Sequence, residues 1–255
     1  MRIIVCFKQV PDTSARLRVE PGSLEPHRAG LLPVVNPYDE FALEEALRLR
    51  DSGHEAEIIL LTLVTEPVDE SLFHGLAMGA DRAIVLRLPA GTASAPLVTT
   101  RILAAEIEPL RPDLIFCGER AVDDDAAQVG PGLAEMLNLP QICGAERAEV
   151  DETGRMIRAR CRRPSAGEVF TSDLPCLVSF VRGESLPRYP SLDDVFNAGD
   201  KPVETREITP ADAEPPQRVA LLAPRETRAG RTIEGEPEDA VEQLLSDPDG
   251  MVSFL

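Results

Sequence analysis

The sequence predicts an α/β protein built on a twisted parallel sheet with helices on both faces. Over the first 140 residues, short apolar runs rich in β-branched residues alternate with segments whose apolar residues recur at helical spacing. Continuous apolar runs are typical of strands that helices bury on both sides. The alternation of such strands with helices is typical of α/β folds. Beyond these residues the pattern changes, and we expect a β-hairpin and an extended carboxyl-terminal arm.

The expected strands of the parallel sheet are four apolar runs, at 3–7, 57–64, 83–88 and 114–117. The helices expected between and after them lie at 41–50, 69–78, 95–108 and 126–137. Ligands of such sheets bind at the carboxyl ends of the strands, where the strand order reverses. We therefore expect any ligand site to involve the loops that follow these strands.

The later part of the chain predicts a different arrangement. Segments 141–150 and 155–163 predict strands joined by an Asp-Glu-Thr-Gly turn, and 176–181 predicts another strand. From Gly183 onward prolines, glycines and acidic residues recur, and only 219–222 and 240–245 have a regular pattern. We therefore divide the chain into an α/β domain, residues 1–182, and an arm, residues 183–255. Five apolar residues favour an arm that packs on another chain over a solvated tail: Leu186, Tyr189, Leu192, Val195 and Phe196.

The composition restricts the class of partner. The chain has 255 residues and a formal net charge of −18. A surface this acidic repels phosphate backbones and anionic lipids, so we expect no nucleic-acid partner. No segment approaches the roughly 20 apolar residues of a membrane span, and the amino terminus does not resemble a signal peptide. We expect a cytoplasmic protein with no direct membrane insertion.

The residues that usually carry catalysis form no recognisable constellation. The five cysteines are scattered and include no CxxC pair, whereas metal and iron–sulfur sites normally need closely spaced thiolates. We identify no pair of acids and no nucleophile with a base in the sequence. We therefore expect no catalytic residue and no metal site.

Two stretches could instead hold a ligand. Asn36 and Pro37 match the residues that start a helix, and capping alone explains them. The same helix start follows a strand, so Asn36 could also meet an adenine or a ribose. The second stretch, 118–132, opens another helix, whose free N–H groups can bind an anion. The three aspartates of this stretch are better suited to capping the helix or contacting a ribose than to binding a phosphate. Lys8, at the end of the first strand, is either a phosphate ligand or an ordinary surface lysine.

Several stretches resemble the electron transfer flavoprotein β-subunit family, the FixA group. They run in family order over most of the chain: IIVCFKQVPD (3–12), NPYDEFALEEALRL (36–49), GLAMGADRA (75–83), DDDAAQVGPGLA (123–134) and PRYPSL (187–192). The resemblance implies an adenine-nucleotide-hydrolase-like sheet and a heterodimer with a homologous α subunit. It also implies a carrier, without catalytic residues of its own, that passes electrons from a dehydrogenase to an acceptor through FAD held mostly by the α subunit.

The family's β subunits have a pocket of their own, which holds AMP in simple members and a second FAD in bifurcating ones. The stretches 8–12 and 127–131 look closer to the bifurcating and nitrogen-fixation branch. Residues 124–126 lack the glycine and threonine of that branch, so AMP and FAD both remain open. Carried over by position, the cofactor-binding residues would be Cys6, Lys8, Asn36, Pro37, Tyr38, Asp39, Leu63, Asp123, Asp124, Asp125, Ala126, Ala127, Gln128, Val129, Gly130 and Ala134.

The stretch 176–198 resembles the loop with which this family recognises a partner dehydrogenase. The partner-recognition residues would be Glu184, Leu186, Pro187, Arg188 and Tyr189. The lysine-rich run that usually follows is replaced by residues 196–200, Phe-Asn-Ala-Gly-Asp. We therefore expect the partner to be a dehydrogenase other than the ordinary acyl-CoA type, or an iron–sulfur oxidoreductase.

Two other functions share the expected fold. One is a stand-alone adenine-nucleotide sensor of the universal-stress type, against which the long arm and the Pro-Arg-Tyr stretch argue. The other is an adenylating enzyme such as an ATP pyrophosphatase. That class needs a Ser-Gly-Gly-type phosphate loop after the first strand, where this chain has residues 8–11, Lys-Gln-Val-Pro.

Overall fold

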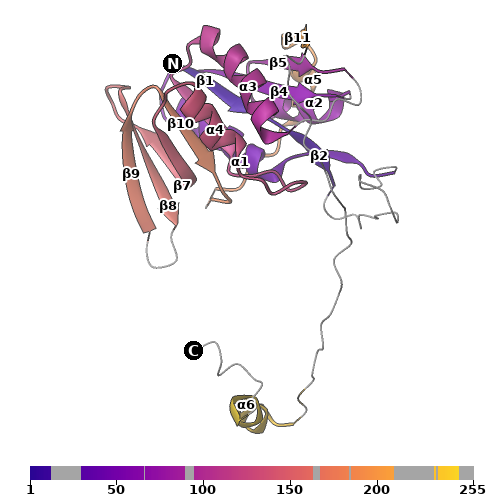
Figure 1. Cartoon of the computed structure of the whole chain (residues 1–255), viewed down its shortest axis with the longest axis vertical. Helices are drawn as coiled ribbons and strands as arrows, with labels where there is room; N and C mark the ends of the chain where they lie inside the picture. Colours follow the sequence, from indigo (N-terminus) through magenta and orange to yellow (C-terminus); the bar gives the residue numbers. More distant parts are fainter. Residues whose placement is uncertain are drawn as a thin grey trace.

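The structure is a computed structural model that describes residues 1–12, 30–65, 67–89, 95–162, 167–183, 185–209, 233 and 235–246. Within these residues the chain forms one large sheet, one small sheet and the helices around them (Figure 1). The strands of the large sheet are β1 (Arg2–Cys6), β4 (Glu57–Val64), β5 (Arg82–Arg87), β6 (Leu114–Gly118), β7 (Gln141–Val150), β8 (Met156–Arg162), β9 (Gly167–Asp173), β10 (Cys176–Phe180) and β11 (Val203–Glu207). Strands β2 (Gln9–Pro11) and β3 (Pro33–Val35) pair with each other.

The large sheet has the strand order β11-β5-β4-β1-β6-β10-β7-β8-β9. The strands from β11 to β7 pair in parallel, whereas β7 with β8 and β8 with β9 pair antiparallel. The chain places β4 and β5 on one side of β1 and then crosses to place β6 on the other side. The strand order therefore reverses between β1 and β6, and this is where an α/β sheet offers a crevice.

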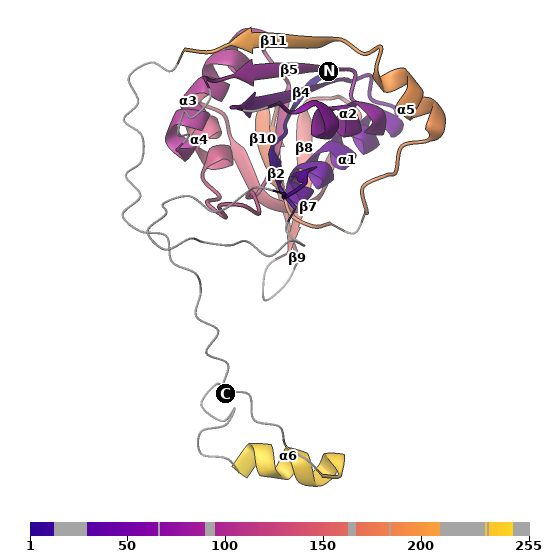
Figure 2. The ribbon, with the colours of Figure 1, turned by 90° about the vertical axis from the view of Figure 1, so that its right-hand side faces the viewer.

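Helices cover both faces of the sheet, as predicted. Helices α1 (Pro37–Asp51), α2 (Asp69–Met78) and α5 (Leu192–Ala198) lie on one side of it. Helices α3 (Pro96–Ile107) and α4 (Val129–Met136) lie on the other side, with the 3-10 turn η1 (Glu108–Leu110) after α3 (Figure 2). The last helix, α6 (Pro237–Ser246), has no buried residue and lies apart from the sheet in both views. In the described part of the chain, no helix has the length and apolar character of a membrane span.

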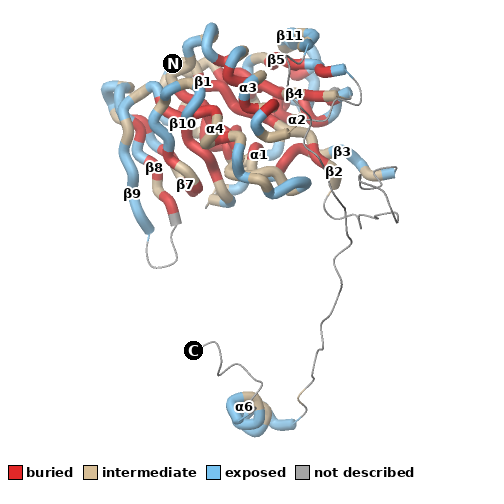
Figure 3. Tube along the Cα trace, viewed as in Figure 1, coloured by how far each residue is buried: buried red, intermediate tan, exposed pale blue. Residues whose placement is uncertain are grey.

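Side chains along the central strands alternate between two apolar cores. On β1, Ile3 and Val5 belong to the core under α1 and α2, whereas Ile4 and Cys6 belong to the core under α3 and α4. The same alternation holds along β4 and β5, because successive side chains of a strand point to opposite faces. Both faces are therefore buried, which explains why the sequence shows continuous apolar runs here (Figure 3).

Most predicted elements are confirmed, and the differences have physical reasons. Strand β4 and helix α2 have the predicted bounds, and β7 and β8 form the predicted hairpin. The helix expected at 126–137 begins only at Val129, because Asp125 and Ala127 have left-handed backbone conformations, with φ of 50° and 52°.

The region after Gly183 contains more regular structure than its sequence predicts. Helix α5 follows a capping box in which the side chains of Ser191 and Asp194 each accept from the other residue's backbone N–H. Strand β11 extends the large sheet in parallel beside β5. The predicted element 240–245 lies within α6, and the segment 219–222 lies outside the described residues.

Candidate functional site

A pocket opens at the carboxyl ends of β1, β4 and β6, at the point where the strand order reverses. Strand ends and helix α3 supply apolar side chains to its lining, and the β6–α4 loop and the start of α4 supply backbone and polar groups. The predicted cofactor-binding residues that line this pocket are Cys6, Lys8, Asn36, Asp39, Leu63, Asp124, Ala126, Ala127, Gln128, Val129 and Gly130. Residues far apart in the sequence thus meet in one cavity.

The other predicted cofactor-binding residues lie beside the pocket. Pro37 is the first residue of α1, and the guanidinium carbon of Arg120 lies 5.6 Å from the centre of the Tyr38 ring. Asp123 and Asp125 form ion pairs with neighbouring basic residues, and Ala134 is buried in the core beneath α4. These residues shape the surroundings of the pocket without lining it.

Asp39 joins the ends of β1 and β6 across the switch point. One of its carboxylate oxygens accepts from the backbone N–H of Lys8 at 2.8 Å, and the other accepts from that of Gly118 at 2.9 Å. Only 5% of Asp39 is exposed, and burial raises its pKa to about 7 although both N–H groups act to lower it. Asp39 therefore fixes the first turn of α1 against two strands that line the pocket.

Asn36 stands at the N-cap position of α1, but its side chain makes no capping bond. Its amide nitrogen donates to the carbonyl oxygen of Arg120 at 3.0 Å, and its amide oxygen accepts from the N–H of Val122 at 3.3 Å. The capping explanation is therefore wrong for the Asn36 side chain, which instead holds the β6–α4 loop on the start of α1. The Asn36 amide bonds to the backbone of Arg120 and Val122 instead of to the free N–H groups at the start of α1.

Lys8 offsets part of the negative charge of the loop. Its ammonium nitrogen lies 2.7 Å from a carboxylate oxygen of Asp123 and 3.2 Å from one of Asp124. Asp124 in turn accepts from the N–H of Ala126 at 3.1 Å. The aspartates thus have partners within the chain, and Lys8 holds the loop to the end of β1.

The start of α4 lies at the pocket. Val129 and Gly130 are the first residues of α4 and line the pocket, and the first N–H groups of a helix have no partner within it. The first N–H of this helix to bond back to the preceding turn is that of Gly132, which donates to the carbonyl of Gln128 at 3.0 Å. An anion at this position would meet N–H donors and the positive end of the helix dipole.

Comparison with known proteins is consistent with this geometry. The family described as "Electron transfer flavoprotein domain" matches residues 28–212. Protein FixA of Sinorhizobium fredii is 35% identical over an alignment of 266 positions that covers 96% of this chain and 93% of that protein.

The chain belongs to the electron transfer flavoprotein family.

Other relatives place it in the β-subunit and FixA group of this family. The electron transfer flavoprotein subunit beta of Clostridium acetobutylicum is 38% identical over 204 residues, 80% of this chain and 77% of that subunit. The acryloyl-CoA reductase electron transfer subunit gamma of Anaerotignum propionicum is 30% identical over an alignment of 263 positions that covers 96% of this chain and 97% of that subunit. The resemblance to the β-subunit family is therefore confirmed over nearly the whole length.

In this electron transfer flavoprotein chain, the predicted partner-recognition residues differ in exposure. Leu186 is 69% exposed and Tyr189 is 94% exposed, whereas Pro187 and Arg188 between them are partly buried. Arg188 instead forms ion pairs with Glu44 and Asp51 of α1. Glu184 lies outside the described residues.

Sequence reasoning missed part of the pocket lining. Helix α3 supplies Pro96, Thr99 and Leu103, and the end of β6 supplies Cys117. The rule that ligands bind at the carboxyl ends of strands could have indicated Cys117, near the end of β6. Nothing in the local sequence indicates those of α3, because only the packing of α3 against α4 brings them to the pocket.

The described residues contain no group of three or more His, Cys, Asp or Glu side chains arranged to hold a metal ion. Cys6 and Cys117 both line the pocket as free thiols. Burial raises the pKa of Cys6 to about 12 and that of Cys117 well above its usual value. Both thiols therefore remain protonated at neutral pH and serve as apolar lining.

Proposed function

We propose that this chain is the β subunit of a heterodimeric electron transfer flavoprotein in the cytoplasm. It would pass electrons from a dehydrogenase or an iron–sulfur oxidoreductase to an acceptor through FAD shared with an α subunit. The observation that carries this proposal is the pocket, where Cys6, Asn36, Leu63 and residues 126–130 converge as the family resemblance predicts. FAD, when bound, supplies the redox chemistry, and the protein supplies its position and electrostatic surroundings.

We propose an adenine nucleotide as the ligand of the pocket, either AMP or part of a second FAD. Apolar side chains such as Leu61, Leu63 and Leu103 can pack against a base. The N–H groups of Val129 and Gly130 can hold a phosphate without a basic side chain. Because Lys8 already pairs with two aspartates, we assign the phosphate contact to backbone rather than to that ammonium group.

A nucleotide in this pocket would have a structural role. It would contact β1, β4, β6, α3 and α4 together, and a ligand that binds only the folded state stabilises it by mass action. Asp39 and Asn36 would keep the pocket in shape, since they join α1 to strand ends and to the β6–α4 loop. No proton transfer or covalent step is assigned to this chain.

We propose two contact regions outside the pocket. Leu186 and Tyr189 would contact the redox partner, supported by their exposure beside a segment held on α1. Residues 183–255 would act as an arm that also embraces the α subunit, supported by the absence of buried residues in α6. A relative is named an electron transfer subunit of acryloyl-CoA reductase, which supports a reductase or dehydrogenase as partner.

Co-expression with an electron transfer flavoprotein α subunit of the same source tests the proposal. We expect a yellow one-to-one heterodimer whose flavin is bleached by a dehydrogenase fraction of the source cells, and a colourless chain when this subunit is expressed alone. The contradicting result is a chain that folds alone, binds ATP or AMP tightly and does not associate with the α subunit. That outcome would favour the stand-alone nucleotide sensor.

A further inference from the structure

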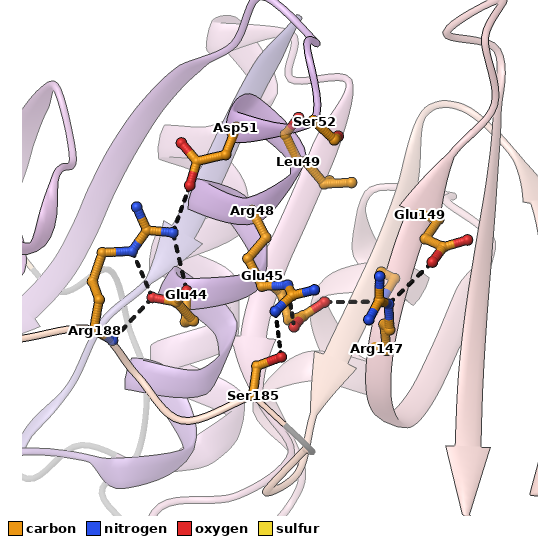
Figure 4. Close-up of polar contacts among 11 residues, drawn as sticks. Glu44, Glu45, Arg48, Leu49, Asp51, Ser52, Arg147, Glu149, Ser185 and Arg188 are labelled. Carbon is orange, nitrogen blue, oxygen red and sulfur yellow. Dashed lines mark hydrogen bonds and ion pairs between the residues drawn. The ribbon is translucent and has the colours of Figure 1, made fainter.

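A buried carboxylate of α1 holds the segment of residues 185–192, here named the docking segment. The guanidinium of Arg188 donates from Nε to Glu44 Oε2 at 2.8 Å and from Nη2 to Glu44 Oε1 at 3.0 Å (Figure 4). The backbone N–H of Arg188 donates to the same carboxylate at 3.1 Å. Nη2 also donates to Asp51 at 2.7 Å, so one residue binds α1 through three of its donor atoms.

The geometry of this contact is that of a structural ion pair. The fork-to-fork arrangement of guanidinium and carboxylate is the strong form of such pairs. Glu44 is only 5% exposed, so the docking segment covers a charge that needs Arg188 as its partner. The hydrogen bonds that Arg188 donates to Glu44, and then those that it donates to Asp51, raise the pKa of Arg188, so it stays charged throughout the physiological range.

A second contact joins the same two parts of the chain. Arg48 of α1 donates to the hydroxyl of Ser185, at the start of the docking segment (Figure 4). Arg48 also lies 3.5 Å from Glu45, whose carboxylate accepts from the N–H of Ala148 on β7 at 3.0 Å. The docking segment is thus fixed to α1, and α1 is fixed to the sheet.

Large side chains on either side of Arg188 in the docking segment are much more exposed than Arg188 itself. Leu186 is 69% exposed, Tyr189 is 94% exposed and Leu192, at the end of the segment, is 78% exposed. Large apolar side chains at this exposure contribute almost nothing to the fold, and they are suited to contact another protein. In the docking segment, Arg188 therefore attaches the segment to α1, and Leu186 and Tyr189 remain exposed for contact with another protein.

We propose that Arg188 and Glu44 are positioning residues that act as a pair and hold Leu186 and Tyr189 in the arrangement that the redox partner binds. This inference rests on the proposed function, because it assumes that the partner docks on these side chains. Glu44 lies beneath the segment and cannot touch a partner while the segment is in place. Removing either member of the pair leaves a charge in a site built for two, and the segment then leaves α1 for much of the time.

Removing Arg188 or Glu44 is expected to weaken binding of the redox partner without slowing electron transfer. If the arranged segment is populated only about one tenth of the time, the apparent affinity for the partner falls roughly tenfold. The FAD environment lies elsewhere, so the rate at saturating partner is expected to stay the same. An arginine that contacted the partner directly would behave differently, since Glu44 would then have no influence on docking.

The test compares Glu44→Gln, Arg188→Gln and the double variant in the full heterodimer. Glu57→Gln is the matched control, because Glu57 also pairs with arginines, Arg2 and Arg82, and makes no contact with the docking segment. One measurement is amide hydrogen exchange of residues 186–192 in the heterodimer. The other is the steady-state kinetics of flavin reduction. KM and kcat are measured for each variant with the same dehydrogenase fraction that reduces the wild type.

We expect both single variants and the double variant to raise exchange in residues 186–192 and to raise KM by roughly tenfold with kcat unchanged. The double variant should be no worse than either single one, and Glu57→Gln should match the wild type. The inference would be overturned if Arg188→Gln raised KM while Glu44→Gln left KM unchanged. It would also be overturned if hydrogen exchange of residues 186–192 were unchanged in both variants. If no fraction reduces the wild-type heterodimer, the proposed function itself fails, which is a separate outcome.

Discussion

Replacing Gly118 with alanine is expected to destabilise the proposed heterodimer by about 3 kcal/mol and to lower the nucleotide content that we propose for the pocket. A Cβ atom at this position would lie 2.5 Å from Asp39 Oδ1, 2.6 Å from Tyr38 Cβ and 3.0 Å from the Tyr38 carbonyl carbon. Two of these atoms belong to the first turn of α1 near its backbone, which cannot rotate away. The helix would have to move off β6, and the bond from the Gly118 N–H to Asp39 would be strained with it.

Gly199→Ala is the matched control for this substitution. Gly199 follows α5 with an ordinary φ of −66°, and no atom lies within 4 Å of a Cβ built on it. Urea unfolding of the two variant heterodimers and their nucleotide content measure the difference. Equal unfolding midpoints for the two variants would show that α1 does not need the close approach at Gly118.

The second large effect is expected at Asp39. Replacing it with asparagine places an amide NH₂ against one of the two N–H groups, of Lys8 or Gly118, that the carboxylate now satisfies. A buried donor left without an acceptor costs about 1–3 kcal/mol, and the opposed donors add repulsion. We expect Asp39→Asn to lower the free energy of unfolding by about 3 kcal/mol at mildly acidic pH.

This difference should depend on pH in a defined direction. The pKa of Asp39 is raised to about 7 in the folded protein, above the value of about 4 in an unfolded chain. The folded state then binds one more proton between these values, so the stabilising contribution of Asp39 is complete below about pH 4 and is lost as the pH rises through 7. The disadvantage of Asp39→Asn should shrink by up to about 1.4 kcal/mol per pH unit in this window.

Urea unfolding of both heterodimers at pH 5.5, 6.5 and 7.5 measures the trend. A disadvantage that stays constant or grows with pH would mean that the two backbone N–H groups keep Asp39 ionised in the folded protein. Burial would then not be the dominant influence on its pKa.

The sheet could be predicted from the sequence because burial on both faces leaves a strong local pattern. The apolar run of β4 and the helical spacing of α2 each determine an element with the predicted bounds. Strand β11 carries the polar sequence Val-Glu-Thr-Arg-Glu, and its place depends on hydrogen bonds to β5, which no local pattern encodes. Strands β2 and β3 are three residues long and pair only with each other, so they too leave no signal.

The sequence could predict which residues form much of the site but not which contacts they make. The family stretches indicate which residues meet at the pocket, and the rule for α/β sheets indicates where they meet. The sequence predicts that the stretch 118–132 binds an anion through free N–H groups, but it does not reveal that the absence of a side chain at Gly118 allows α1 to approach β6. Arg188 was expected to contact a partner, and only the fold reveals that Glu44, distant in the sequence, engages its guanidinium.

The nucleotide content of the pocket tests the central claim most directly. The heterodimer would be purified, denatured, and analysed for FAD and AMP by chromatography against protein concentration. We predict one adenine nucleotide per β subunit beyond the FAD shared with the α subunit, either one AMP or a second FAD. A heterodimer that contains a single FAD and no other adenine nucleotide would contradict the assignment of the pocket at the ends of β1, β4 and β6.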